Sequence, residues 1–250
     1  MAINSAPKTG ASGRSNRFLL VVDSDASNLY YTSMLLQRLD YHICSSKTAT
    51  EAREMATVAV PALIITAHYL RDATCLELME QLKQDPRLQS VPVIVLSPEG
   101  DLVGQRQCLD AGAAACLTTP VEAESLYRTV QEAIEPTPRK NIRISTRLPV
   151  TVNDQPLNCG EGECASVLSE HGIYIRTLKP YFRSTRLSLR ISLKGRSVSA
   201  LAEVLYSHTF GEGPFGEPGM ALKFVQIAPQ DQEQLRLFIR AEVTRGIKPV

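Results

Sequence analysis

Four positions at the ends of predicted strands could take part in one reaction. Asp23, Ser97 and Thr119 each stand at or just after a short apolar run, and Ala67 holds the same place after another run. Ligands of parallel α/β sheets bind beyond the carboxyl ends of the strands, so these positions should meet at one edge. Asp23 offers a carboxylate there, and Ser97 and Thr119 offer hydroxyl groups, whereas Ala67 offers only a methyl group.

Two arginines form a second candidate site. Arg139 and Arg143 stand four residues apart in the stretch 135–146, which also contains two prolines. A guanidinium group can bind a phosphate at two points, and its flat face can stack on a purine. Exposed basic segments often contain this spacing, so the alternative is that both arginines are solvated charges of a linker.

Residues 17–134 alternate apolar runs with amphipathic stretches, which predicts an α/β fold with a doubly wound, five-stranded parallel sheet. The predicted strands are 17–23, 41–46, 62–66, 91–97 and 114–118, and the predicted helices are 27–39, 48–58, 74–84, 102–112 and 121–134.

Beyond the linker the apolar period becomes two, which is typical of strands. Short runs separated by Gly, Pro and polar turns predict a small antiparallel β-barrel that begins at 147–152 and ends with an amphipathic helix at 228–245. The predicted organisation is a disordered tail at 1–16, an α/β domain at 17–134, a linker or arm at 135–146 and a β-barrel domain at 147–250.

The composition limits the function classes. The 250 residues carry a net charge of +1, which argues against a protein that coats nucleic acid through many phosphate contacts. Residues 1–16 contain no apolar signal segment, and no apolar run is long enough to span a bilayer. We therefore expect a cytoplasmic protein without membrane insertion or direct nucleic-acid binding.

The chain has six cysteines, and buried free thiols are the expectation in a chain of this length. Cys159 and Cys164 lie close together in a Gly/Glu-rich stretch, where a metal or redox pair is an alternative. No second Cys/His pair follows at the spacing of a zinc finger. We therefore expect no resident metal or cofactor.

Residues 17–134 resemble the receiver domain of two-component response regulators. In that family an acidic pair holds magnesium, an aspartate at the end of the third strand accepts a phosphoryl group, and a lysine steadies it. Here Ser24 stands in the place of one acid, Ala67 in that of the acceptor and Thr119 in that of the lysine. The resemblance implies a receiver scaffold without its chemistry, serving packing or dimerisation. It rests on Asp23-Ser24-Asp25, PALIITAHYLRDATCLEL at 61–78, Ser97 and Leu117-Thr118-Thr119-Pro120.

Other residues of this half do not restore the acceptor. Asp72 lies five residues past the strand end, and Thr66 should face away from Ala67 along the strand. His68, in the same loop, is expected at the surface. Cys108 and Tyr127 lie in the helices through which receiver domains often pair, so a homodimer is an open alternative.

Residues 136–245 are similar to the PilZ family of bacterial cyclic di-GMP receptors. The family carries Arg-x-x-x-Arg before its first barrel strand and Asp/Asn-x-Ser-x-x-Gly on a nearby strand and turn. The chain reads Arg139-Lys140-Asn141-Ile142-Arg143 and then Val167-Leu168-Ser169-Glu170-His171-Gly172. The resemblance implies that Arg139, Arg143, Ser169 and Gly172 bind cyclic di-GMP.

Together the two halves predict a non-enzymatic signalling effector. It would bind cyclic di-GMP through the arm and the barrel, and an unidentified protein through the receiver-like half. Binding would order residues 135–146 and change how the domains are arranged.

Two alternatives stay open. An adaptor that binds no nucleotide is supported by Val167, which offers no hydrogen bond to a guanine edge, and Ser169 and Gly172 would then be ordinary turn residues. A phosphorelay receiver with unusual residues is the other.

Overall fold

The computed structural model describes residues 18–212 and 216–248. The chain forms two compact units. One unit contains residues 18–142 and 243–248, and the other contains residues 143–212 and 216–242. The predicted tail at 1–16 lies outside the described residues.

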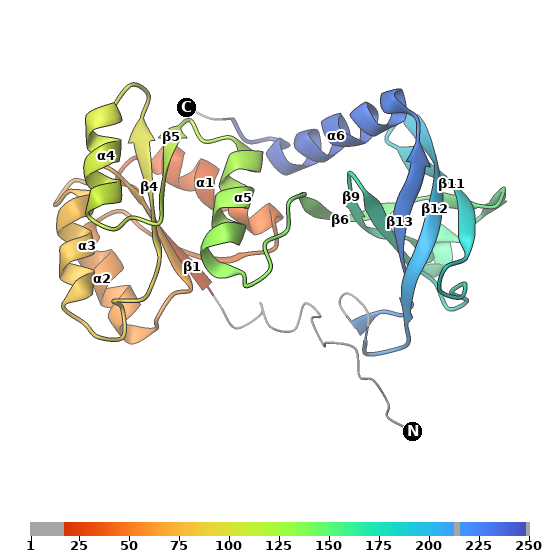
Figure 1. The fold of residues 1–250 in the computed structure, drawn as a ribbon, viewed down its shortest axis with the longest axis horizontal. Helices are drawn as coiled ribbons and strands as arrows, with labels where there is room; N and C mark the ends of the chain where they lie inside the picture. The colour runs from red at the N-terminus through yellow and green to blue at the C-terminus, as the bar shows by residue number, and fades with distance from the viewer. Residues whose placement is uncertain (1–17, 213–215, 249–250) are drawn as a thin grey trace. The chain divides into compact units, whose positions relative to one another are not determined.

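The first unit is a five-stranded parallel sheet in the order β2-β1-β3-β4-β5, with helices on both faces (Figure 1). This confirms the doubly wound α/β prediction. The strands are β1 (Phe18–Val22), β2 (His42–Ser46), β3 (Leu63–Ala67), β4 (Val93–Pro98) and β5 (Ala115–Thr119). The helices are α1 (Ala26–Arg38), α2 (Ala49–Val58), α3 (Cys75–Lys83), α4 (Leu102–Asp110) and α5 (Ala123–Ile134).

The side chains of the strands alternate between the two faces of this sheet. Leu20 and Val22 of β1 and Ile64 of β3 share a core cluster with residues of α2, α3 and α4. Figure 1 shows these three helices on one side of the sheet, with α1 and α5 on the other side. Because both faces are covered, the three inner strands β1, β3 and β4 are nearly continuous apolar runs, whereas the edge strands β2 and β5 are more polar.

Capping side chains set where two of these helices begin. Thr74 Oγ1 accepts a hydrogen bond from the backbone N–H of Glu77 at 3.3 Å, and the Thr74 N–H donates to Glu77 Oε2 at 2.7 Å. Asp101 Oδ1 accepts from the Gly104 N–H at 2.9 Å. Cys75 is therefore the first residue of α3, and Gly104 lies in the first turn of α4.

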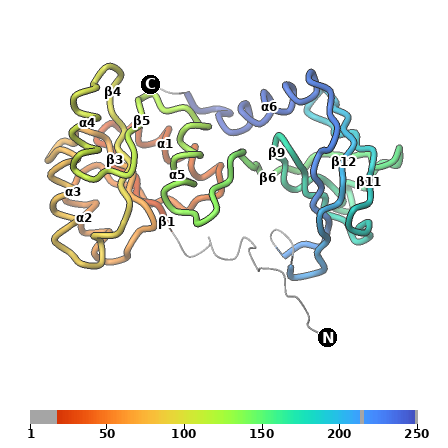
Figure 2. The backbone as a smooth tube through the Cα atoms, viewed as in Figure 1, coloured from red at the N-terminus to blue at the C-terminus, as the bar shows by residue number. Residues whose placement is uncertain are grey.

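The second unit is a curled antiparallel sheet of eight strands, a half-barrel, which is followed by helix α6 (Pro229–Thr244) (Figure 2). The predicted antiparallel β fold with a C-terminal helix is confirmed. The strand order is β6-β9-β10-β13-β12-β11-β7-β8. The strands are β6 (Arg143–Leu148), β7 (Val150–Val152), β8 (Gln155–Pro156), β9 (Cys164–Ser169), β10 (Gly172–Arg176), β11 (Arg186–Leu193), β12 (Arg196–His208) and β13 (Gly219–Ile227).

The start of the β unit differs from the prediction. The first strand begins at Arg143, four residues earlier than Arg147, so Arg143 is a residue of the sheet rather than of the arm. The predicted strand at 147–152 is divided at Pro149, which has no N–H to donate to a ladder. Residues before the proline pair with β9, and residues after it pair with β11.

Among the helices that the structure describes, none combines the length and the apolar character that a membrane span requires.

Candidate functional site

The strand register aligns three of the four predicted binding residues in one row across the second sheet. Arg143 of β6 pairs with Ser169 of β9, Ser169 pairs with Gly172 of β10, and Gly172 pairs with Lys223 of β13. Directly paired residues of antiparallel strands project from the same face. We call these four residues the Arg143 row.

The Arg143 row lies on the solvent-facing side of the sheet. Arg143 and Lys223 are exposed, and Ser169 and Gly172 are half-buried. The residue next to each along its strand points the other way and is buried: Ile144, Leu168, Ile173 and Leu222. A ligand can therefore reach the row without any change in the core.

Ser169 and Gly172 flank the two-residue turn between β9 and β10. Ser169 Oγ donates a hydrogen bond to the Gly172 carbonyl oxygen at 3.1 Å, and the lone pairs of Ser169 Oγ remain able to accept. A Cβ atom on Gly172 would lie 2.5 Å from the carbonyl oxygen of Leu222. Glycine is therefore required where β10 approaches β13.

Arg139 lies outside the row, in the segment that precedes β6. Its backbone N–H donates to Gln131 Oε1 of α5 at 3.1 Å, and its side chain is half-buried. The four residue steps from Arg139 to Arg143 span at most about 13–14 Å when extended. The structure thus places Arg143, Ser169 and Gly172 together and leaves Arg139 at the end of a short tether.

A second row runs beside the first and contains Val167. Ser145 pairs with Val167, Val167 with Tyr174, Tyr174 with Ala221, and Ala221 with Tyr206. The Val167 side chain is half-buried and presents only carbon atoms to this face. We call these five residues the Val167 row.

The sequence did not single out the aromatic residues of this face. The rings of Tyr206 and His208 lie edge to face with centroids 5.0 Å apart, and those of Tyr174 and His208 are 6.3 Å apart. Burial, together with the nearby Tyr206 and Glu217, raises the pKa of Tyr174 to about 12. Tyr206 is 47% exposed, so one flat ring at this face is open to a ligand. The run EVLYSH contains Tyr206 and His208, but the sequence carried no signal that their rings meet Tyr174.

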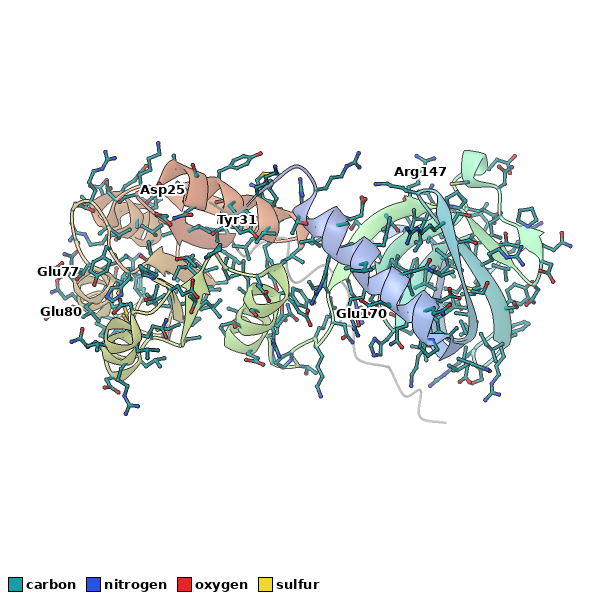
Figure 3. All side chains as sticks on the ribbon, turned by 90° about the horizontal axis from the view of Figure 1, so that it is seen from above. Asp25, Tyr31, Glu77, Glu80, Arg147 and Glu170 are labelled. Carbon is teal, nitrogen blue, oxygen red and sulfur yellow. The ribbon has the colours of Figure 1, made fainter. Side chains whose placement is uncertain are left out.

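An ion pair that the sequence could not reveal ties the turn to α6. Arg236 Nε and Nη2 lie 3.1 and 3.4 Å from the two carboxylate oxygens of Glu170. Arg236 Nη1 also lies 3.1 Å from Glu233 Oε2. Glu170 is labelled in Figure 3, where it lies beside α6. This bidentate contact between a guanidinium group and a carboxylate fixes the turn that Ser169 and Gly172 flank.

In the first unit, the acidic residues after β1 are engaged in local structure. Asp25 Oδ1 accepts from the N–H groups of Ser27 and Asn28 at 2.8 and 2.9 Å and thereby caps α1. Asp23 is buried, and its Oδ1 accepts from the Asp25 N–H at 2.8 Å. Burial raises the pKa of Asp23, the backbone hydrogen bond lowers it, and the charge of Asp25 raises it, with a net increase.

The remaining strand-end positions do not supply an acceptor. Ala67 is the last residue of β3 and pairs with Leu96. Ser97 is fully buried, and its carbonyl oxygen accepts from Thr119 Oγ1 at 3.3 Å. The hydroxyl of Ser97 lies 3.4 Å from Asp101 Oδ2. These contacts join neighbouring loops and leave no carboxylate at the end of β3.

Asp72 caps α2 from a distance in sequence. Its carboxylate accepts from the N–H groups of Ala49 and Thr50 at 2.9 and 3.0 Å and from Thr50 Oγ1 at 2.9 Å. Desolvation alone would raise the pKa of Asp72, but these hydrogen bonds lower it overall. Thr66 is fully buried, and its hydroxyl donates to the Ala67 carbonyl at 3.1 Å.

The expectation that His68 lies at the surface was wrong. The residue is 4% exposed. Its backbone N–H donates to the Leu96 carbonyl oxygen at 2.8 Å and so continues the β3–β4 pairing by one residue. The alternation of the strand then turns His68 toward the core shared with α3 and α4. Cys108 and Tyr127, in the helices named above for receiver pairing, are also buried and offer no contact surface.

Comparison with known protein families agrees with this division into two units. Residues 19–131 match the model of the response regulator receiver domain, and residues 137–241 match the model of the PilZ domain. The chain joins a receiver domain to a PilZ domain. Both are non-catalytic domains of signalling proteins, and the PilZ domain is of a type that binds cyclic di-GMP.

Curated relatives match over about half of the chain. The two-component response regulator ORR6 of Oryza sativa subsp. japonica is 27% identical over 122 residues, which are 48% of this chain and 72% of that protein. ORR12 of the same subspecies is 28% identical over 119 residues, which are 46% of this chain and 95% of that protein. The match to ORR7 spans 57% of its length.

Solved structures of response regulators are similar to about half of this chain. A putative response regulator from Chloroflexus aurantiacus J-10-fl is 23% identical, with a TM-score of 0.46, over 47% of this chain and 97% of that one. The chemotaxis response regulator CheY4 of Vibrio cholerae is also 23% identical, with a TM-score of 0.44, over 47% of this chain and 98% of that one.

Proposed function

We propose that this protein is a non-enzymatic bacterial signalling effector that binds cyclic di-GMP on its PilZ domain. The observation that carries the proposal is the Arg143 row. There a guanidinium group, a hydroxyl group, a glycine and an ammonium group stand side by side on a solvent-facing sheet. Cyclic di-GMP has two phosphates and two guanines, which match these groups.

The charges of the row suit a ligand with two phosphates. Arg143 and Lys223 are separated by three strand spacings, about 14 Å. Arg143 can hold one phosphate with two parallel hydrogen bonds, whereas Lys223 acts as a point charge. Gly172 has no side chain, so the ligand can lie against the strand between the two cations. Arg139, on its short tether, supplies a further guanidinium that closes over the bound nucleotide.

The Val167 row would face the bases. Tyr206 offers a ring on which guanine can stack, and the Ser145 side chain is on the strand beside Val167. Val167 itself cannot accept a hydrogen bond from a guanine edge. The proposed site therefore has cationic groups for both phosphates, but it lacks a hydrogen-bond acceptor for the guanine edge at Val167.

The receiver domain would act by protein contact, without phosphorylation. Ala67 cannot accept a phosphoryl group, and Asp25 and Asp72 are engaged in capping helices. We expect no mass increase of the purified protein after incubation with magnesium and a small phosphodonor such as acetyl phosphate. Stoichiometric phosphate incorporation would refute this part of the proposal and revive a phosphorelay role.

Calorimetric titration with cyclic di-GMP tests the binding proposal. We expect saturable binding that GTP and cyclic GMP do not reproduce. Arg143→Ala should weaken it by at least about tenfold, because a charged hydrogen bond contributes about 1.5–3 kcal/mol. Arg190→Ala, which removes an exposed arginine of β11 outside both rows, is the matched control and should bind as the unaltered protein does. Equal affinities of the Arg143 and Arg190 variants would show that the site is wrong.

A nucleotide-independent adaptor is the second candidate, and Val167 is the observation that favours it. In that case the Arg143 row would be a solvated surface, and titration with cyclic di-GMP up to high micromolar concentration would produce no heat of binding. Arg139→Ala tests the receptor candidate further: the variant should bind cyclic di-GMP more weakly than the unaltered protein, because the tethered guanidinium is removed.

A further inference from the structure

Three buried side chains of the receiver domain bring soft metal-binding atoms together. The Nδ1 or Nε2 atom of His68 and the Sγ atoms of Cys75 and Cys108 all lie within 4.8 Å of one another. The two thiols are 3.2 Å apart. Cys75 and Cys108 have no exposed surface, and His68 is 4% exposed. None of the three takes part in the proposed nucleotide site.

Three different elements deliver these side chains. His68 follows the last residue of β3 and points to the face that carries α2, α3 and α4. Cys75 is placed by the capping box as the first residue of α3, and Cys108 lies in the last turn of α4. The group therefore joins the sheet to two helices whose starting points the sequence sets independently.

The imidazole of His68 is buried without a well-aligned hydrogen bond. Its Nδ1 lies 3.0 Å from Asp101 Oδ2, yet within the described part of the chain no acceptor meets this nitrogen with hydrogen-bond geometry. A Cβ atom on Gly104 would clash with the His68 ring and with the Asp101 carboxylate. The fold thus makes room for the histidine and sets the Asp101 carboxylate beside Nδ1, close to it but without hydrogen-bond geometry.

We propose that His68, Cys75 and Cys108 bind a zinc ion that links β3, α3 and α4. Two thiolates and an imidazole are the ligands that zinc prefers in structural sites. Bond lengths of about 2.0–2.3 Å place the ligand atoms of a tetrahedral site about 3.3–3.8 Å apart. The observed separations, 3.2 Å between the thiols and at most 4.8 Å in the group, lie on either side of this range. Asp101 beside the His68 ring is the carboxylate that commonly orients a metal-binding histidine.

A third thiol stands next to the group. Cys116 of β5 interacts with Cys108, and burial followed by Cys108 raises the pKa of Cys116 to about 11. Cys116 is not among the three residues whose ligand atoms lie within 4.8 Å of one another, and its Sγ lies 3.6 Å from the Gln105 carbonyl oxygen, so it would have to move to bind the same ion. Cys75 and Cys108 have no exposed surface, which argues against a redox-active pair.

Metal analysis of the full chain tests the proposal. The protein is purified under reducing conditions without chelators or affinity metals, loaded with zinc, desalted and analysed for bound metal. We expect about one zinc per chain, and at least about tenfold weaker binding in Cys75→Ser and Cys108→Ser when a chromophoric chelator competes. Cys44→Ser, which removes a half-buried thiol of β2 outside the group, is the matched control and should keep the zinc.

A second measurement needs no variant and so does not depend on whether the variants fold. Cobalt(II) added to the unaltered protein should give the absorption of a tetrahedral site with thiolate-to-cobalt charge transfer. Absence of this spectrum, together with no zinc above background after loading, would overturn the proposal. A mass two hydrogens lower under non-reducing conditions, with no bound metal, would overturn it in favour of a Cys75–Cys108 disulfide.

Discussion

Restoring a carboxylate at Val167 should strengthen nucleotide binding. Val167 lies two residues from Ser169 on β9, about 7 Å along the same face, which is within the width of a nucleotide base. Its side chain is half-buried between Ser145 and Tyr174, so a carboxylate there would be partly shielded from water. A new hydrogen bond between a charged acceptor and a guanine edge contributes about 1.5–3 kcal/mol, which corresponds to roughly 10- to 150-fold in affinity.

The assay is calorimetric titration of Val167→Asp with cyclic di-GMP, beside two control variants. Val167→Asn keeps an acceptor without charge and should gain about 0.5–1.5 kcal/mol, a smaller improvement. Val167→Ala removes carbon atoms only and should leave the affinity within about threefold of the unaltered protein. If Val167→Asp binds no better than Val167→Ala while circular dichroism shows it folded, the guanine edge does not meet this position. The orientation of the ligand on the two rows would then be wrong.

Three further predictions concern the local architecture. Gly172→Ala should lower thermal stability and nucleotide affinity together, because its Cβ would lie 2.5 Å from the carbonyl oxygen of Leu222. Gly104→Ala should destabilise the receiver domain by about 1–3 kcal/mol in urea unfolding, because the clash with His68 outweighs the gain of about 1 kcal/mol in helix propensity. Asp23→Asn should stabilise the receiver domain at pH 7, because burial raises the pKa of Asp23 and the ionised form is disfavoured in the fold.

Each of these predictions has a control. For Gly172, the comparison is Gly195→Ala, a turn glycine whose added Cβ would meet no atom within 4 Å, although its positive φ of 91° carries some strain of its own. For Gly104, an unchanged or higher free energy of unfolding would show that His68 can move aside at no cost.

For Asp23, the direction of the pKa shift sets the pH range in which the substitution should matter. The pKa of Asp23 is higher in the folded protein than its ordinary value of 3.8. Protonation of Asp23 therefore stabilises the fold fully below pH 3.8, and this stabilisation is lost as the pH rises through the raised pKa. The advantage of asparagine should therefore disappear below about pH 3.8, and an advantage that is constant with pH would contradict the assignment to ionisation.

The sequence by itself determined the local features of this protein. Apolar period and turn residues predicted the α/β half and the antiparallel half, because periods of 3.6 and 2 are set by the backbone of each element. Element boundaries followed within a few residues where a cap or a proline marks them. The absence of an acceptor at Ala67 was also evident from the sequence, because the position is counted along one continuous segment.

Only the tertiary structure decided which residues meet. The sequence placed Arg143 on an arm, but pairing of β6 with β9 moved it onto the sheet beside Ser169. The proline at position 149 divides the predicted first strand, and the two parts join different neighbours. Strand register depends on contacts between segments far apart in the chain, and a local period carries no information about it.

The group formed by His68, Cys75 and Cys108 is the clearest case of this difference. His68, Cys75 and Cys108 are spread over 41 positions without a recognisable ligand spacing, and the histidine was expected at the surface. One additional residue of β3–β4 pairing turns His68 inward, and the packing of α3 and α4 on the same face brings both thiols to it. A sequence pattern detects ligands that one short segment supplies, whereas ligands delivered by three packed elements become visible only when the elements are assembled.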